Sequence, residues 1–209
     1  MKYKIFVVGP AKHYSDWIYN HELTDVLEEA DIVLFTGGED VDPSLYECEP
    51  HPSTYSNIER DRKEKEIFDS VRPDQLCLGI CRGSQFLCVM NGGLLIQDVS
   101  NHALYTTHTI INAKSDYDRY EITSTHHQMQ YPFNLNRGVD YDILFYAARR
   151  SKYYAGNRIS NPPCEPEIVL YHVEGKPKCL AIQGHPEMMT NPDTPTIPML
   201  NQLISQYVR

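Results

Sequence analysis

The sequence predicts an α/β protein, a three-layer sandwich with a mostly parallel central sheet. In the first hundred residues, short apolar segments rich in β-branched residues alternate with segments of helical periodicity. Strands that alternate with helices form right-handed crossovers, which place a parallel sheet between two helical layers. Beyond residue 120 the pattern changes to strand-like segments followed by one helical segment. We therefore expect the second half to extend the sheet, partly with antiparallel strands.

The predicted strands are short apolar runs bounded by glycine, proline or polar residues. Gly9-Pro10 ends the first of them and Gly37-Gly38 ends the second. In the first half the predicted strands are 3–8, 31–36, 75–80 and 94–99. In the second half they are 120–125, 143–147, 167–173 and 178–183.

Apolar residues at helical spacing predict four helices. The segment 57–71 is rich in both charges and has a narrow apolar face, so we expect an exposed helix with solvated charges. The segment 83–90 ends at Asn91-Gly92-Gly93, a pattern typical of a helix C-terminus. A last helix is predicted near 197–207. The first helix is predicted from the spacing of Leu23, Val26, Leu27 and Ala30.

Composition excludes several classes of protein. The 209 residues contain 19 Lys+Arg and 28 Asp+Glu, a formal net charge of −9. Binding of duplex nucleic acid needs concentrated positive charge, so we expect no nucleic-acid partner. No apolar run approaches the roughly 20 residues that span a bilayer, so we expect no membrane partner. Without a linker or repeat, the sequence predicts one domain over residues 1–209.

Cysteine and histidine spacing argues against a metal site. The six cysteines form no C-x-x-C pair, and no export signal is evident, so we expect reduced thiols in the cytoplasm. The spacing of four histidines is looser than is usual for metal ligands, and we expect them to be loop or pocket residues. These are His102, His108, His126 and His127. No metal and no organic cofactor are predicted.

The segment 78–85 carries the clearest chemical signal. An apolar strand runs into a helix through Gly79-Ile-Cys81-Arg-Gly83, where the glycines permit a sharp turn and close packing of neighbouring elements. Cys81 should project from the top of the sheet at the helix N-terminus. Free amides and the helix dipole there favour a thiolate. The alternative is a small buried apolar side chain, but we favour a nucleophile.

A cysteine nucleophile needs a base, and the base needs an orienting acceptor. His185 follows the predicted strand 178–183, and Pro186 forces it into an extended conformation. Residues two apart in an extended chain project to the same side, so Glu187 can hold one imidazole nitrogen while the other faces Cys81. A purely structural histidine is the alternative to this catalytic role.

An acyl-transfer site also needs donors for the oxyanion. The amide of Arg82 follows the nucleophile directly, and the Gly37-Gly38 turn has amides free to point outward. For the two glycines the alternative is a plain tight turn. Gln85 lies four residues after Cys81 on the same helix face, where its amide could contact substrate or cap the loop above.

Taken together, these motifs resemble the class I glutamine amidotransferase superfamily, which implies its flavodoxin-like fold. Further segments resemble the branch that contains γ-glutamyl-γ-aminobutyrate hydrolase and γ-glutamyl hydrolase, the peptidase C26 group. They are GGEDVDPSLY at 37–46, Arg60-Asp61, GGLLIQD at 92–98 and STHHQ at 124–128. The resemblance spans residues 37–187.

The resemblance implies that Cys81 attacks a glutamine-type side-chain carbonyl, and that His185 and Glu187 complete a triad. It also implies oxyanion amides from Gly38 and Arg82. The substrate is then a small γ-glutamyl compound, and no cofactor is needed.

The resemblance further implies that Gln85 lies near the amino-acid end of the substrate and that three residues border the pocket. These three are Ser124, His126 and His127. The sequence departs from the branch in a shorter segment between 98 and 120. It departs again at Gly184, which should leave more room, or more mobility, beside the catalytic imidazole.

Two functions share this chemistry. One is hydrolysis of γ-glutamyl amides, which the segments 37–46 and 124–128 favour. The other is a glutaminase subunit that delivers ammonia to a separate synthetase, since the chain has no nucleotide-binding loop. The sequence leaves the oligomeric state open, with a homodimer as one option.

The sequence also admits two other hypotheses for the function. An α/β-hydrolase with a cysteine elbow, as in dienelactone hydrolases, would carry its acid before the histidine, whereas Glu187 follows His185. A non-catalytic binding module on the same scaffold would not need the complete set of Cys81, His185 and Glu187.

Overall fold

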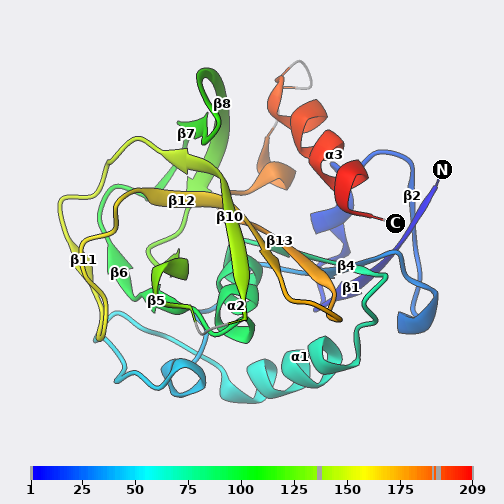
Figure 1. The fold of residues 1–209 in the computed structure, drawn as a ribbon, viewed down its shortest axis with the longest axis horizontal. Coiled ribbons are helices and arrows are strands. Elements are labelled where there is room, and N and C mark those ends of the chain that lie inside the picture. Colours follow the sequence, from blue (N-terminus) through cyan, green and yellow to red (C-terminus); the bar gives the residue numbers. More distant parts are fainter. Residues whose placement is uncertain (1, 136–137, 190, 192–193, 209) are drawn as a thin grey trace.

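A nine-stranded sheet runs through the centre of the protein (Figure 1). The structure is a computed structural model that describes residues 2–135, 138–189, 191 and 194–208. The strand order is β2-β1-β3-β4-β13-β12-β10-β7-β8. In that order the strands are His21–Leu23, Tyr3–Val8, Ile32–Phe35, Leu76–Ile80, Lys178–Ile182, Glu165–His172, Asp140–Ala147, Ala103–Asn112 and Ser115–Thr125.

The sheet divides into a parallel and an antiparallel half. Strands β2, β1, β3, β4 and β13 are parallel neighbours. From β13 through β12, β10 and β7 to β8 every pairing is antiparallel. Parallel neighbours need crossover connections, whereas short turns join antiparallel ones, as in the β7–β8 hairpin. The α/β prediction is confirmed, and the sheet is mixed because the second half supplies hairpins instead of crossover helices.

Helices cover both faces of this sheet. Figure 1 shows α1 (Ile58–Ser70) and α2 (Arg82–Met90) on one side and α3 (Thr196–Tyr207) on the other. Alternate residues of β3 point to opposite faces. Accordingly, Val33 packs in the core under α1 and α2, and Leu34 packs in the core under α3. The three-layer arrangement follows from burying both faces of each central strand.

Smaller elements complete the fold. Strand β5 (Leu94–Ile96) pairs with β9 (Met129–Tyr131), and β6 (Asp98–Val99) pairs with β11 (Tyr154–Ala155). The predicted strand 94–99 is therefore two short strands in separate sheets. Single 3₁₀ turns lie at Lys12–Ser15, Leu27–Glu29, Pro43–Tyr46, Pro132–Asn134 and Pro186–Met188. Among the described residues, no helix is long and apolar enough to cross a membrane.

The helix predicted at 23–30 is wrong. Residues 21–23 instead form the edge strand β2, and only a 3₁₀ turn follows at 27–29. Leu23 and Val26 are 40% and 46% exposed, and of the predicted apolar stripe only Leu27 and Ala30 pack against the core. Backbone pairing with β1 replaces the helix, and the amide of Thr24 continues it by donating to the carbonyl of Ile5.

The helix predicted at 57–71 exists as α1, but its charges are not all solvated. Asn57 caps its N-terminus by accepting from the amide of Arg60. Asp61, Glu64 and Phe68 are buried on one face. This buried charged face is a correction to the sequence analysis, and it leads directly to the functional site.

Candidate active site

Cys81 lies where β4 ends and α2 begins. Its backbone φ is +52° and ψ is −108°, a conformation that L-residues rarely adopt. The flanking glycines permit it, because a Cβ on Gly79 would lie 2.5 Å from the carbonyl oxygen of Gly83. A Cβ on Gly83 would lie 2.1 Å from the carbonyl oxygen of Phe35. The tight strand–turn–helix predicted from the glycine spacing is present.

Strand β13 carries the histidine to this turn. Ile182 pairs with Ile80, and the amide of Cys81 donates to the carbonyl of Ile182 at 2.8 Å. His185 then follows within three residues, and its amide donates to the carbonyl of Thr123 at 2.9 Å. The parallel pairing of β4 with β13 thus brings the ends of two distant segments together at one edge of the sheet.

Gly184 does not leave room beside the imidazole, contrary to expectation. A Cβ at this position would lie 2.6 Å from Cγ1 of Ile122 and 2.9 Å from the carbonyl oxygen of Thr123. The space is already filled by β8, so the glycine serves close packing of the strand end against that neighbour.

His185 lies between a carboxylate and a thiol. Its Nδ1 is 2.6 Å from Oε1 of Glu187, and its Nε2 is buried without a hydrogen-bond partner among the described residues. Burial lowers the pKa of His185, but the side chains of Cys81 and Glu187 outweigh burial and raise the pKa to about 10. The imidazole therefore carries a proton at neutral pH, and its second nitrogen is available to Cys81.

Tyr14 joins this group from the turn at 12–15, and sequence reasoning did not single it out. Its ring centroid is 6.3 Å from that of His185. Burial, Glu187 and Cys81 together raise the pKa of Tyr14 to about 12, so the phenol stays protonated. The tyrosine provides a neutral wall beside the imidazole.

Arg60 of α1 contacts the Gly37-Gly38 turn. Gly38 has a φ of +144°, and a Cβ there would lie 2.1 Å from Nη1 of Arg60. Nη2 of Arg60 donates to the carbonyl oxygen of Gly37 at 3.0 Å. In a trans peptide the carbonyl and the next N–H point in opposite directions. The guanidinium thereby directs the amide of Gly38 away from α1.

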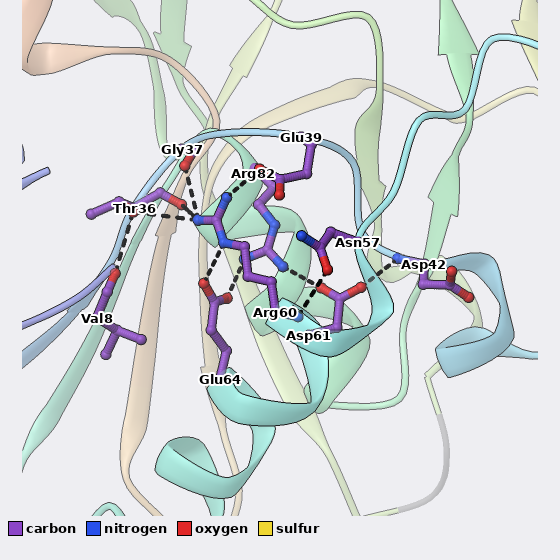
Figure 2. Close-up of polar contacts among 10 residues, drawn as sticks. All are labelled: Val8, Thr36, Gly37, Glu39, Asp42, Asn57, Arg60, Asp61, Glu64 and Arg82. Atoms are coloured by element: carbon purple, nitrogen blue, oxygen red, sulfur yellow. Dashed lines mark hydrogen bonds and ion pairs between the residues drawn. The ribbon is translucent and has the colours of Figure 1, made fainter. Parts of the chain in front are cut away.

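Arg82 supplies its backbone at the start of α2 and buries its side chain beneath the site. The side chain is 1% exposed and forms ion pairs with Asp61 and Glu64. Glu64 also binds Nε of Arg60 at 2.7 Å. Figure 2 shows this network joining α1 to the Gly37 turn and to the residue after Cys81. The amide of Arg82 is one of those at a helix N-terminus that have no intrahelical acceptor.

Sequence reasoning missed this ion-pair network, although the sequence contains a signal for it. The charge content of 57–71 predicts a solvated helix, yet Asp61 and Glu64 lie three residues apart and Arg60 and Glu64 four apart, the spacings at which side chains meet on a helix. Phe68 continues the same face into the core. A charged stripe in line with an apolar residue indicates a buried face.

A pocket of about 250 Å³ opens over Cys81. The predicted residues Gly38, Arg82, Gln85, His126 and His127 all line it. Gln85 uses its amide to donate to the carbonyl of Gln128 at 2.9 Å, so it holds the loop above.

Ser124 and the two histidines differ in their surroundings. Ser124 is buried, and its hydroxyl donates to the carbonyl of His102 at 2.6 Å, outside the residues that line the pocket. His127 contacts Asp40 at 3.1 Å, a hydrogen bond that raises the pKa of the imidazole. Burial lowers the pKa of His126 to about 4. His126 also belongs to a buried group with His102 and Glu167 that could hold a metal ion.

The fold is that of the class I glutamine amidotransferase-like superfamily. Over 100% of both chains, it resembles the structure of PurLQS from Thermotoga maritima, with a TM-score of 0.62 and 15% identity. It also resembles a Thermoplasma acidophilum protein described as a GMP synthase subunit, with a TM-score of 0.59 and 15% identity. That match covers 99% of this chain and 96% of the other.

Residues 17–134 match the family Peptidase C26, and the chain belongs to this family. A glutamine amidotransferase-like protein of Lactococcus lactis subsp. cremoris, the YvdE homolog, is 35% identical over 51% of this chain and 67% of its own length. A Mycobacterium tuberculosis protein named as a glutamine amidotransferase is 39% identical over 37% of this chain. The match spans only 27% of the Mycobacterium protein. Both relatives carry the words glutamine amidotransferase in their names, and the matches cover about half of this chain or less.

Proposed function

We propose that the protein hydrolyses γ-glutamyl amides through a thioester on Cys81, with His185 and Glu187 as the other triad members. The observation that carries the proposal is the position of His185. Its Nδ1 is hydrogen-bonded to Glu187, and the side chain of Cys81 helps to raise its pKa. The family match covers Cys81 but ends before His185. The assignment of the base and the acid therefore rests on this geometry.

The first half-reaction forms the thioester. Cys81 adds as its thiolate to the γ-carbonyl carbon, and the amides of Gly38 and Arg82 stabilise the oxyanion. His185 then donates its proton to the amine nitrogen as the carbon–nitrogen bond breaks. The raised pKa of His185 ensures that this proton is present at neutral pH. The products are a free amine, or ammonia, and a glutamyl thioester.

The second half-reaction releases glutamate. Neutral His185 accepts a proton from water, and the resulting hydroxide adds to the thioester carbonyl. The same two amides hold the second oxyanion, and the carbon–sulfur bond breaks to return the sulfur of Cys81 beside a protonated imidazole. Glu187 holds the imidazole in one orientation through both steps, since its carboxylate stays on Nδ1.

The test is Cys81→Ala compared with Cys48→Ala. Cys48 is half-buried and lies outside the Cys81 pocket. Amine release from glutamine, γ-glutamyl-γ-aminobutyrate, γ-glutamyl-putrescine and polyglutamates is measured for both variants. We expect Cys81→Ala to lose activity and Cys48→Ala to keep it. Hydroxylamine should trap the thioester as a γ-glutamyl hydroxamate in the parent protein. Undiminished amine release by Cys81→Ala refutes the proposal.

A second function uses the same site. The chain could serve as the glutaminase subunit of an amidotransferase that passes ammonia to a separate synthetase. The fold likeness to PurLQS and to the protein described as a GMP synthase subunit favours this alternative. Glutamine turnover that rises only when a synthetase is added would support it. Turnover of γ-glutamyl amides by the isolated chain would support the hydrolase.

A further inference from the structure

Three buried side chains that meet beside the Cys81 pocket each have a polar atom without a hydrogen bond. Nδ1 of His102, Nε2 of His126 and Oε2 of Glu167 are buried and make no hydrogen bond to any described residue. One donor atom from each of the three side chains lies within 4.8 Å of the others. Buried polar atoms are nearly always paired, so three unpaired ones at one place require a common explanation.

The sheet brings these residues together from distant segments. His102 directly precedes β7 and His126 directly follows β8, and the two strands pair at Ala103 and Thr125. The rings of His102 and His126 have centroids 4.7 Å apart. Glu167 comes from β12. Their wide separation in sequence explains why spacing alone predicted only loop or pocket histidines.

One nitrogen of each histidine is held by an oxygen acceptor outside the cluster. Nδ1 of His126 lies 2.8 Å from the carbonyl oxygen of Gln128, which can only accept. Nε2 of His102 lies 3.1 Å from Glu165. The other nitrogen of each ring, Nδ1 of His102 and Nε2 of His126, is the one left to bind an ion.

Glu165 accepts three further hydrogen bonds. The amides of Arg150 and Ser151 donate to it at 3.0 and 2.9 Å, and the hydroxyl of Tyr154 donates at 2.7 Å. A carboxylate that accepts this many hydrogen bonds is stabilised in its ionised form. Glu165 is therefore held in place as the acceptor that faces Nε2 of His102.

Glu167 is held in the same way from its far side. Its Oε1 lies 2.8 Å from Nε2 of His108 and 3.7 Å from Nδ1 of His102, and its Oε2 is buried without a hydrogen-bond partner among the described residues. Each of the three side chains is thus held by one fixed contact and keeps a buried polar atom without a hydrogen bond. Metal-binding histidines and carboxylates are characteristically oriented by such outer contacts.

We propose that His102, His126 and Glu167 bind one divalent transition-metal ion, with zinc as the representative ion. Two imidazole nitrogens and one carboxylate form a donor set typical of zinc and of other nitrogen-preferring divalent ions. A cation removes the repulsion among three inward-facing acceptors. Since His126 also lines the pocket, the ion fixes the segment above Cys81 whose Gln128 carbonyl holds Gln85.

The test uses the Cys81→Ala protein, because Cys81 and His185 could themselves bind zinc. This protein has no proposed catalytic activity, so the result is independent of the proposed hydrolase function. After chelator treatment it is loaded with Zn²⁺ and desalted, and bound zinc is measured by mass spectrometry. We expect one equivalent per chain and a higher melting temperature than that of the chelated protein. Absence of bound zinc overturns the proposal.

Variants in the Cys81→Ala background locate the ion. Glu167→Gln should lower zinc affinity more than the roughly 10–100-fold expected for the outer partner variant Glu165→Gln. His172→Gln is the matched control. His172 lies on the same strand, β12, and forms an ion pair with Asp142, which is not one of the three proposed ligands. Its affinity should equal that of the parent. Equal affinity in Glu167→Gln would refute the assignment.

A spectroscopic measurement covers the case in which a ligand variant fails to fold. X-ray absorption of the zinc-loaded Cys81→Ala protein should show imidazole scattering with Zn–N distances of about 2.0–2.1 Å. A shell at about 2.3 Å, typical of Zn–S, would place the ion at another cysteine and overturn the proposal.

Discussion

Nη2 of Arg60 donates to the carbonyl oxygen of Gly37 at 3.0 Å, and this one bond sets the direction of the peptide that carries the Gly38 amide. The same guanidinium is anchored through Nε to Glu64 and through Nη1 to Glu39, both at 2.7 Å. Figure 2 shows Arg60 reaching from α1 to the turn while these two carboxylates flank it. We therefore regard Arg60 as a positioning residue for the proposed oxyanion site.

Replacing Arg60 with lysine should lower kcat with little change in KM. Lysine keeps the charge beside Glu64 and Glu39 but cannot donate in three fixed directions. The loss should approach the ~10²–10³-fold that removal of one oxyanion donor costs in kcat. Steady-state kinetics on a γ-glutamyl amide measure the split between kcat and KM.

Arg62→Lys is the control. Arg62 is exposed and forms an ion pair with Glu59 on the same helix. Alkylation of Cys81 by iodoacetamide needs no oxyanion donor and should proceed at the parental rate in Arg60→Lys. A raised KM with unchanged kcat would contradict the positioning role.

Gly38→Ala should abolish most activity and destabilise the protein. Its φ of +144° and the 2.1 Å approach to Arg60 both oppose a side chain. Gly175→Ala separates the two effects, because Gly175 has a φ of +76° but no atom within 4 Å of the added Cβ. Backbone strain alone costs about 1–3 kcal/mol. Equal losses of unfolding free energy in both variants would show that the contact with Arg60 is unimportant.

The alkaline limit of activity should report the His185 proton. The pKa of His185 is raised in the folded protein to about 10, above its ordinary value of about 6.5. The associated stabilisation is therefore complete below about pH 6.5 and is lost as pH rises through about 10. The same deprotonation removes the proton that the leaving amine needs, so kcat/KM should fall there.

Glu187→Gln tests this assignment through the pH profile. Without the carboxylate that helps to raise the pKa of His185, the fall in kcat/KM should move to lower pH. Glu174→Gln, at an exposed residue near β12, should leave the profile in place. If kcat/KM of Glu187→Gln still falls near pH 10, the group that loses its proton there is not His185.

Glu64→Gln should reduce the free energy of unfolding by about 1–3 kcal/mol, because the buried guanidinium of Arg82 loses one of its two carboxylate partners and keeps only Asp61. The side chains of Arg82 and Glu64 are 1% and 4% exposed. Glu59→Gln on the same helix removes an exposed ion pair with Arg62 and should have little effect. Denaturant titration measures the free energy of unfolding of both variants. Similar values for the two variants would mean that the buried network contributes no more than a surface pair.

Local sequence was sufficient to predict the strand–turn–helix at Cys81. The glycines that permit this turn lie within two residues of the cysteine, so the constraint is written in one short segment. The His185-Pro-Glu187 spacing is equally local, and the structure places the two side chains 2.6 Å apart. The α/β class also followed from periodicity, because burial of both sheet faces imposes apolar runs on the strands.

Periodicity was insufficient where a helix needs a surface to pack on. Leu23 and Val26 have the spacing of a helix, yet both side chains are exposed and residues 21–23 form an edge strand. Conversely, the charge of Asp61 and Glu64 predicts exposure, although a buried partner, Arg82, compensates them. In both segments the deciding partner, β1 for the first and Arg82 for the second, lies elsewhere in the chain.

The sequence by itself determined the tight turn at Cys81, the histidine–glutamate pair and the layered class of fold, because each depends on residues that are neighbours along the chain. Tertiary structure alone decided that β13 lies beside β4, which brings His185 to Cys81. It also decided that Arg60 orients the Gly37 carbonyl and that His102, His126 and Glu167 meet. These relationships depend on strand order and on which charges are buried together, and no local pattern specifies either.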